Sequence, residues 1–258
     1  MPERFAVWQA LAWTVCATAT LSLALTLVVA LFGPRVDIVP LGLAQVGVYG
    51  AALLLFAFWR KTPLRELLAL RVVPLRLCLV AAALGVALQF PCTLLANLVD
   101  HFYPLPEGVL QRRLALITPH SLAHGVAIVL VVSLAGPCVE EFFFRGALFG
   151  ALRRAHSALV TLVVISACFV AAHLDLHLLL PLVPAAWFMA ELRERSGSIW
   201  PSLALHAAFN SLTLLGVFSG LAPTGRPPPV PPLVAVLACL AAAALFRQMQ
   251  RIVADAEP

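Results

Sequence analysis

The stretch SLAHGVAIVLVVSLAGPCVEEFFFRGALFGAL, residues 121–152, decides the fold. It is long enough to cross a bilayer, because the hydrocarbon core needs about 20 apolar residues of helix. Its only charged residues are Glu140, Glu141 and Arg145. Seven more apolar runs accompany it, at 7–32, 38–58, 76–98, 157–174, 178–192, 199–219 and 230–247. We therefore predict an all-α, polytopic integral membrane bundle of about eight transmembrane helices, forming a single membrane domain over residues 1–258.

The composition excludes the other common classes of protein. Hydrophobic residues make up 62% of the 258 and charged residues only 11%, whereas a soluble domain is about half apolar and about a quarter charged. A soluble enzyme, a disordered chain and a nucleic-acid reader are therefore excluded. The net charge of +5 is typical of a membrane protein with basic cytoplasmic loops.

The distribution of basic residues predicts the orientation. Five of them crowd the connection between the second and third apolar runs: Arg60, Lys61, Arg65, Arg71 and Arg76. The positive-inside rule makes this connection cytoplasmic, so both termini are expected inside and the segment 99–120 is expected to be a polar external loop. Arginine greatly outnumbers the single lysine in an Ala/Leu-rich chain, which suggests a GC-rich bacterial genome and hence a bacterial cell membrane.

Ionisable residues inside the apolar runs are the candidate functional residues, because each costs at least a few kcal/mol at the bilayer centre. They form three groups on separate runs: Glu140-Glu141-Phe-Phe-Phe-Arg145, Phe169-Val-Ala-Ala-His173 and His206-Ala-Ala-Phe-Asn210. Glu141 and Arg145 are i,i+4 neighbours in the favourable order for an ion pair. Glu140 lies about 100° further round the helix and is free to face the bundle interior. His206 and Asn210 also share one helical face.

Each group also has a purely structural interpretation. Internal charge neutralisation explains the Glu141–Arg145 pair as well as a direct chemical role does, and the third group resembles the polar interhelical clamps of ordinary membrane bundles. His173 has the position of an interfacial residue. Glu140 is hardest to explain in this way, because a carboxylate with no evident partner suits a general base.

The ordered set EExxxR, FxxxH and HxxxN resembles the CPBP family, which comprises the type II CAAX prenyl endopeptidases and bacterial proteins linked to bacteriocin processing and immunity. Gly136-Pro137 before the glutamates and the segment SGSIWP at 196–201 agree with this resemblance. It covers residues 120–220, the expected catalytic core, and a myxosortase-like bacterial branch is one candidate within it.

This resemblance implies an intramembrane glutamic endopeptidase. In the family the first glutamate, here Glu140, activates a water for attack on the scissile carbonyl, and the second-motif histidine, here His173, shares that water. The residues of the third motif, here His206 and Asn210, stabilise the oxyanion. The residues carried over as orienting groups are Glu141 and Arg145.

We predict no metal and no other cofactor. The sequence contains no HExxH zinc motif, no GxSxG elbow and no GxGD pair, which favours glutamate-driven hydrolysis. Three sets of residues are nevertheless able to hold a metal: Glu140/His173/His206, and the i,i+4 pairs His120/His124 and His173/His177. We disfavour zinc because such pairs at span ends are mostly interfacial and because the family is generally described as metal-independent.

The expected partners are the lipid bilayer and a membrane-associated protein or peptide substrate, with no nucleic acid. The substrate would be a C-terminal sorting tail, a leader or a prenylated tail, and the motifs do not choose among them or set the oligomeric state. A non-catalytic membrane scaffold or bacteriocin-immunity protein that keeps the fold is the alternative. A proton or small-molecule transporter is a third hypothesis, which the lack of an internal repeat disfavours.

One feature of the spacing conflicts with a shared site. At about 1.5 Å per residue from the cytoplasmic ends, His206 should lie shallow, Glu140 near mid-depth and His173 deep. Straight upright helices would keep these residues apart. A shared site therefore requires tilt, a re-entrant fifth span or different helix boundaries.

Overall fold

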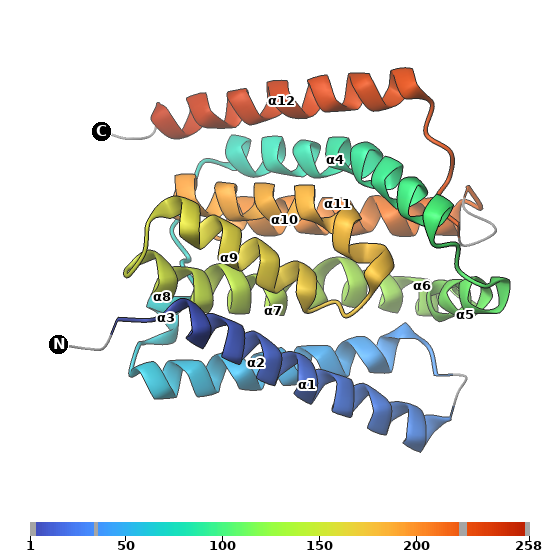
Figure 1. Ribbon diagram of the computed structural model, residues 1–258, viewed down its shortest axis with the longest axis horizontal. Coiled ribbons are helices and arrows are strands. Elements are labelled where there is room, and N and C mark those ends of the chain that lie inside the picture. Colours follow the sequence, from blue (N-terminus) through green and yellow to red (C-terminus); the bar gives the residue numbers. More distant parts are fainter. Residues whose placement is uncertain (1–3, 34–35, 222–225, 256–258) are drawn as a thin grey trace.

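The computed structural model describes residues 4–33, 36–221 and 226–255. All regular elements in these ranges are helices (Figure 1): α1 (Val7–Phe32), α2 (Ile38–Arg60), α3 (Leu64–Leu67), α4 (Leu75–Phe102), α5 (Glu107–Ile117), α6 (Leu122–Val129), η1 (Leu130–Ala135), α7 (Gly136–Glu141), η2 (Phe142–Leu148), α8 (Phe149–Arg153), α9 (Ala158–Ala171), α10 (Leu176–Ser196), α11 (Trp200–Phe218) and α12 (Pro232–Ala254). The two η elements are π-helices.

The long helices run side by side along one axis, and the two ends of the chain lie at the same end of the bundle (Figure 1). Helices α1 and α2 pair on one side, while α11 and α12 both pack against α4 on the other. The continuous segment from α6 to α8 runs between these two groups and contacts both α2 and α11. The segment that carries the glutamates is therefore central in the bundle.

In the described residues, seven helical segments are long and apolar enough to cross a membrane, and α9 is a shorter apolar helix. The prediction of an all-α polytopic bundle of about eight helices is confirmed. Helix α9 has 14 residues, which is about 21 Å of helix against a hydrocarbon core of about 30 Å. The fifth apolar run thus forms a helix too short to cross the membrane upright.

The prediction that the segment 99–120 forms a loop is wrong, because much of it is helical. Helix α4 continues to Phe102, and α5 occupies Glu107–Ile117 within the segment. Pro106 precedes α5 and Glu107 lies in its first turn, where an acidic side chain interacts favourably with the helix dipole. Leu110 is buried against the bundle, and Leu114 and Ile117 on the same helix are half-buried, so an apolar face holds α5 against the bundle.

Two π-helical turns flank α7. Pro137 has no backbone N–H and its ring would clash with the carbonyl four residues earlier in an ordinary α-helix. The preceding turn widens accordingly, and the N–H of Gly136 bonds to the carbonyl of Val131, five residues back. The N–H of Phe149 bonds to Phe144 in the same way after η2. Such turns occur frequently at functional sites, and here they bracket Glu140 and its neighbour.

Gly85 on α4 allows α11 to approach closely just before His206. A Cβ on Gly85 would collide with the backbone carbonyl of Leu205, whereas a Cβ on Gly47 of α2 would meet no atom within 4 Å. We expect Gly85→Ala to destabilise the protein by about 1–3 kcal/mol, as overpacking does, and Gly47→Ala to leave it as stable as the wild type. Thermal denaturation of the purified proteins in detergent measures both. Equal melting temperatures for the two variants would contradict this packing.

Candidate active site

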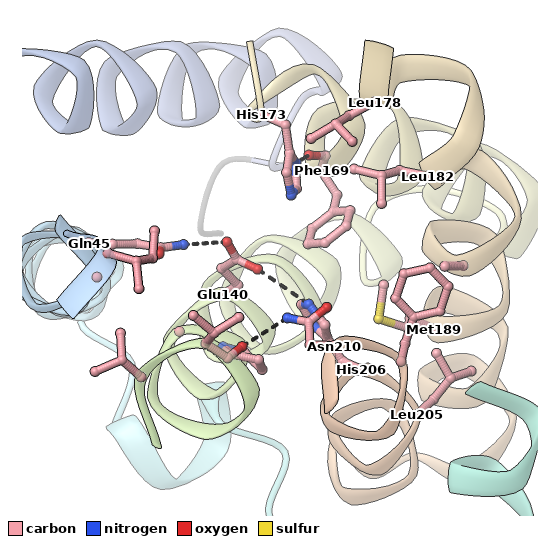
Figure 2. A pocket seen from close by; sticks show the side chains of 18 residues that line it. Gln45, Glu140, Phe169, His173, Leu178, Leu182, Met189, Leu205, His206 and Asn210 are labelled. Carbon is pink, nitrogen blue, oxygen red and sulfur yellow. Dashed lines mark hydrogen bonds and ion pairs between the residues drawn. The ribbon is translucent and has the colours of Figure 1, made fainter. Parts of the chain in front are cut away.

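A pocket of about 380 Å³ lies inside the bundle, with walls from α2, η1, α7, α10, α11 and the end of α9. This volume is within the range of small-molecule and peptide sites. Figure 2 shows that the candidate residues from all three motifs face it: Glu140, His173, His206 and Asn210. Most of the other lining residues are apolar, among them Ile38, Val131, Leu178, Leu182, Met189 and Phe209.

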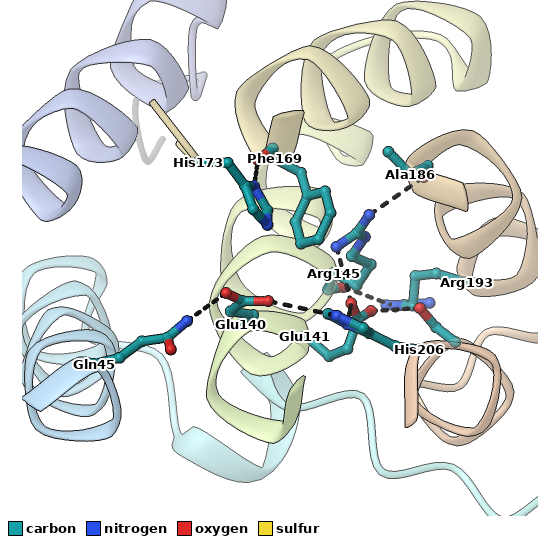
Figure 3. Close-up of polar contacts among 10 residues, drawn as sticks. Gln45, Glu140, Glu141, Arg145, Phe169, His173, Ala186, Arg193 and His206 are labelled. Atoms are coloured by element: carbon teal, nitrogen blue, oxygen red, sulfur yellow. Dashed lines mark hydrogen bonds and ion pairs between the residues drawn. The ribbon is translucent and has the colours of Figure 1, made fainter. Parts of the chain in front are cut away.

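Glu140 has a polar partner on each carboxylate oxygen. Gln45 on α2 donates from Nε2 to Glu140 Oε1 at 2.5 Å, and His206 Nε2 lies 3.6 Å from Glu140 Oε2. Figure 3 shows that the carboxylate lies between these two side chains at the pocket wall. Gln45 was not predicted as a site residue, although an amide inside the apolar run 38–58 is a usable signal.

Glu141 and Arg145 form an ion pair at 2.9 Å, and both side chains are fully buried. Arg145 also donates from Nη2 to the carbonyl of Ala186 on α10 at 3.2 Å, and Arg193 donates to the Arg145 carbonyl at 3.0 Å. Ser202 on α11 donates its hydroxyl to Glu141 Oε2. The pair therefore joins the fourth span to α10 and α11. Ser202, one turn before the third motif, was not singled out in the sequence.

His206 lies between the two glutamates. Its Nδ1 is 3.0 Å from Glu141 Oε1 and its Nε2 is 3.6 Å from Glu140 Oε2. The ring is buried, so its contacts are with protein groups. Both nitrogens thus face carboxylate oxygens, and the buried ion pair of Glu141 holds the ring in this orientation.

Phe169 connects the arginine with both histidines. The Arg145 guanidinium lies 4.0 Å from the centre of the Phe169 ring, a distance at which a desolvated cation–π contact is strong. The same ring packs edge-on against His173 at 4.9 Å and His206 at 5.6 Å between centroids. The phenylalanine of the second motif is therefore part of the site, where it covers the buried arginine.

His173 and Asn210 line the pocket, and a backbone carbonyl holds each of them. His173 Nδ1 lies 2.9 Å from the carbonyl of Phe169, which places the proton on Nδ1 and leaves Nε2 with a lone pair. Figure 3 shows this ring facing Glu140 across the pocket. Asn210 donates from Nδ2 to the carbonyl of Val132 in η1 at 2.9 Å.

The conflict in depth disappears for two reasons. Helix α9 ends at Ala171, and the turn to α10 lies short of the far ends of α1 and α2 (Figure 1). The connection from α10 to α11 is buried, because Ile199 donates to the Ala69 carbonyl at 3.1 Å and Ser198 donates to the Arg71 carbonyl at 2.6 Å. The residues just before α11 thus pack inside the protein against the α3–α4 connection, and the third motif meets the fourth span where His206 Nδ1 lies 3.0 Å from Glu141 Oε1.

Comparison with known proteins identifies the segment that carries these residues. Residues 122–212 match the family model described as type II CAAX prenyl endopeptidase Rce1-like. This range contains every residue of the three motifs. No curated protein and no solved structure matches the chain. Residues 122–212 of this helical bundle are therefore similar to the Rce1-like type II CAAX prenyl endopeptidases, and the predicted likeness to this protease family is confirmed for that segment.

Proposed function

We propose that the chain is an intramembrane endopeptidase of the glutamic type, in which Glu140 activates a water for attack on a peptide bond. The observation that carries this proposal is the position of Glu140 in an apolar pocket, between Gln45 and His206. A water held there is screened from bulk solvent, and fixed donors act more strongly in such a site than in water.

In the proposed reaction, Glu140 accepts a proton from the water as the oxygen adds to the carbonyl carbon. That proton passes to the leaving amine nitrogen as the carbon–nitrogen bond breaks. His173 would share the water through Nε2 and act as acid or base in this transfer. Its Nδ1 contact with the Phe169 carbonyl supports the role, because it orients Nε2 toward the pocket.

The negative oxygen of the intermediate needs donors that are already in position. We propose that His206 supplies one of them from Nε2, which lines the pocket beside Glu140 Oε2. Glu141 would fix the orientation of the ring through its contact with Nδ1. Asn210 would supply a second donor, since one of its two amide protons bonds to Val132 and the other is available.

We propose that this reaction uses no metal. The Gln45 amide donates to one oxygen of Glu140, and this contact orients the carboxylate for proton transfer without a cation. The proposed substrate is a membrane-associated protein, cut at a sorting tail, a leader or a prenylated tail. The apolar pocket wall suits a hydrophobic segment of such a substrate.

We also propose a bacterial cell membrane with both termini in the cytoplasm. The bundle end that holds the termini also holds the α2–α4 connection and the C-terminal ends of α8, α10 and α12. Basic residues from three of these places support the orientation: Arg60 and Arg71 at the α2–α4 connection, Arg153 at the end of α8 and Arg195 at the end of α10.

The test compares cells that produce the wild type with cells that produce Glu140→Gln at equal abundance. Mapping of N- and C-terminal peptides in the membrane and secreted fractions should reveal a small set of proteins that lose one defined terminus in the variant. If the mapped proteins have identical termini in both kinds of cell, and the variant fully complements a deletion strain, the peptidase function is contradicted. That result would favour a membrane scaffold.

Gln45 should position Glu140 without touching the substrate peptide. We expect Gln45→Met, which keeps the length and removes the donor, to lower kcat about tenfold, which corresponds to about 1.4 kcal/mol of lost hydrogen bonding. KM should change little. Steady-state kinetics on a substrate found by the terminal mapping measures both constants, with Gln89→Met on α4 as the control. A change confined to KM would contradict a positioning role.

A further inference from the structure

A second polar cluster lies at the bundle end opposite the termini, where the start of α2 meets the start of α6 (Figure 1). Asp37 caps α2, since its Oδ1 accepts from the backbone N–H of Val39 at 2.9 Å. Its other oxygen, Oδ2, lies 3.3 Å from His124 Nε2. Exposed His120 stacks its ring on that of His124 with 3.9 Å between centroids.

His124 has the features of a ligand without its cation. Its side chain is only 9% exposed. Within the described part of the chain, its Nε2 is buried and has no hydrogen-bond partner, although Asp37 is close by. A carboxylate and an imidazole nitrogen that approach without a well-aligned proton between them leave both groups incompletely satisfied. A cation between the two atoms would satisfy both.

The spacing fits zinc. With Zn–N and Zn–O bonds of about 2.0–2.1 Å, a tetrahedral site holds its ligand atoms about 3.3–3.4 Å apart. The Asp37–His124 distance of 3.3 Å has this value. Ligand atoms from Asp37, His120 and His124 all lie within 4.8 Å of one another, and the described residues contain no other group of three such side chains. We propose that these three residues form a Zn²⁺ site, with the fourth position open to water.

The exposed His120 ring is free to turn toward the cation. Metal binding at His124 Nε2 would leave the ring proton on Nδ1. The long 3.3 Å contact from the His120 backbone N–H to that Nδ1 would then be released.

The other i,i+4 histidine pair shows why this one is distinctive. His177 Nε2 lies 2.7 Å from the carbonyl of Tyr103, and His173 Nδ1 is held by the carbonyl of Phe169. Both of those rings therefore have a nitrogen held by a backbone carbonyl. His124 Nε2 instead faces a carboxylate from a distant part of the chain.

The proposed site would join α2 to α6 at the outer end of the pocket. Ile38 follows Asp37 directly and lines the pocket, as does Gln45 further along α2. Zinc would therefore stabilise the wall that carries the partner of Glu140. The proposal concerns metal binding and does not depend on the proposed hydrolysis.

The test uses the purified full-length protein in detergent, stripped with a chelator and titrated with Zn²⁺ against a chromophoric competitor. We expect one zinc per chain in the wild type. Asp37→Asn, His120→Gln and His124→Gln should each weaken binding at least about tenfold, since even second-shell changes cost 10–100-fold. Asp37→Asn keeps an oxygen that can cap α2, so its effect reports on the metal. Zinc should also raise the melting temperature of the wild type.

Two control variants locate the metal. His101→Gln changes an exposed histidine near the end of α4 and should bind zinc as the wild type does, and so should Glu140→Gln. Unchanged zinc affinity in both His120→Gln and Asp37→Asn would overturn the proposal, even if His124→Gln fails to fold. A wild-type protein that does not bind zinc would also overturn it. Loss of zinc binding only in Glu140→Gln would overturn it too, because that result would assign the metal to the pocket.

Discussion

Glu140→Gln should lower the rate of peptide-bond hydrolysis by about 10²–10⁴-fold, the usual contribution of a positioned general base. Glutamine has nearly the same shape and keeps an oxygen that can accept from Gln45, but it cannot take a proton from water. The side chain lies at the pocket wall and is 11% exposed, so the substitution should leave the fold intact. Single-turnover cleavage of an identified substrate by the purified protein measures the loss.

A glutamate outside the pocket provides the matched control. Glu191 pairs with the exposed Arg195 near the end of α10 at 2.8 Å, and its side chain is 13% exposed, close to the 11% of Glu140. An i,i+4 helix pair of this kind contributes little to stability. Glu191→Gln should therefore cleave at the wild-type rate. The general-base role is contradicted if Glu140→Gln, with an unchanged melting temperature, cleaves within a factor of about three of the wild type.

Glu141→Gln should instead destabilise the protein. We expect the free energy of unfolding to fall by about 3–5 kcal/mol, the usual result when one partner of a buried ion pair is removed. Arg145 is fully buried and would keep its charge without the carboxylate that neutralises it. Glu141 also accepts from Ser202 and contacts His206, so the substitution weakens three contacts together. Equilibrium denaturation in detergent, followed by circular dichroism, measures the loss.

A double variant separates the charge from the rest of the cluster. Glu141→Gln/Arg145→Met removes both charges and should recover much of the lost stability, because apolar replacement of a whole buried pair is often neutral. Cleavage should stay low, since His206 Nδ1 no longer faces a carboxylate. A double variant no more stable than Glu141→Gln would show that the ion pair is not the source of the loss.

The helices and the order of the three motifs follow from local sequence. Runs of about 20 apolar residues have few stable alternatives to a membrane helix, because the bilayer leaves no water for backbone groups. The Glu141–Arg145 contact is also local, since residues four apart meet on one helical face, and the structure contains that pair at 2.9 Å.

The composition of the pocket depends on contacts between distant segments. Gln45 reaches Glu140 across 95 positions of sequence, and Ser202 reaches Glu141 across 61. Each is a single uncharged polar residue in an apolar run, a pattern that ordinary helix packing also produces. Only the packing of α2 and α11 against α7 distinguishes them from structural residues.

The sequence by itself determined that this chain is a membrane bundle and which three segments carry its ionisable residues, because hydropathy and helical periodicity act over a few turns. The tertiary structure decided how those segments meet. A short α9 and the buried residues just before α11 help to bring the three motifs to one pocket, and the approach of α2 to α6 brings Asp37 to His124. These outcomes depend on where each helix begins relative to its neighbours, which packing sets and local sequence does not.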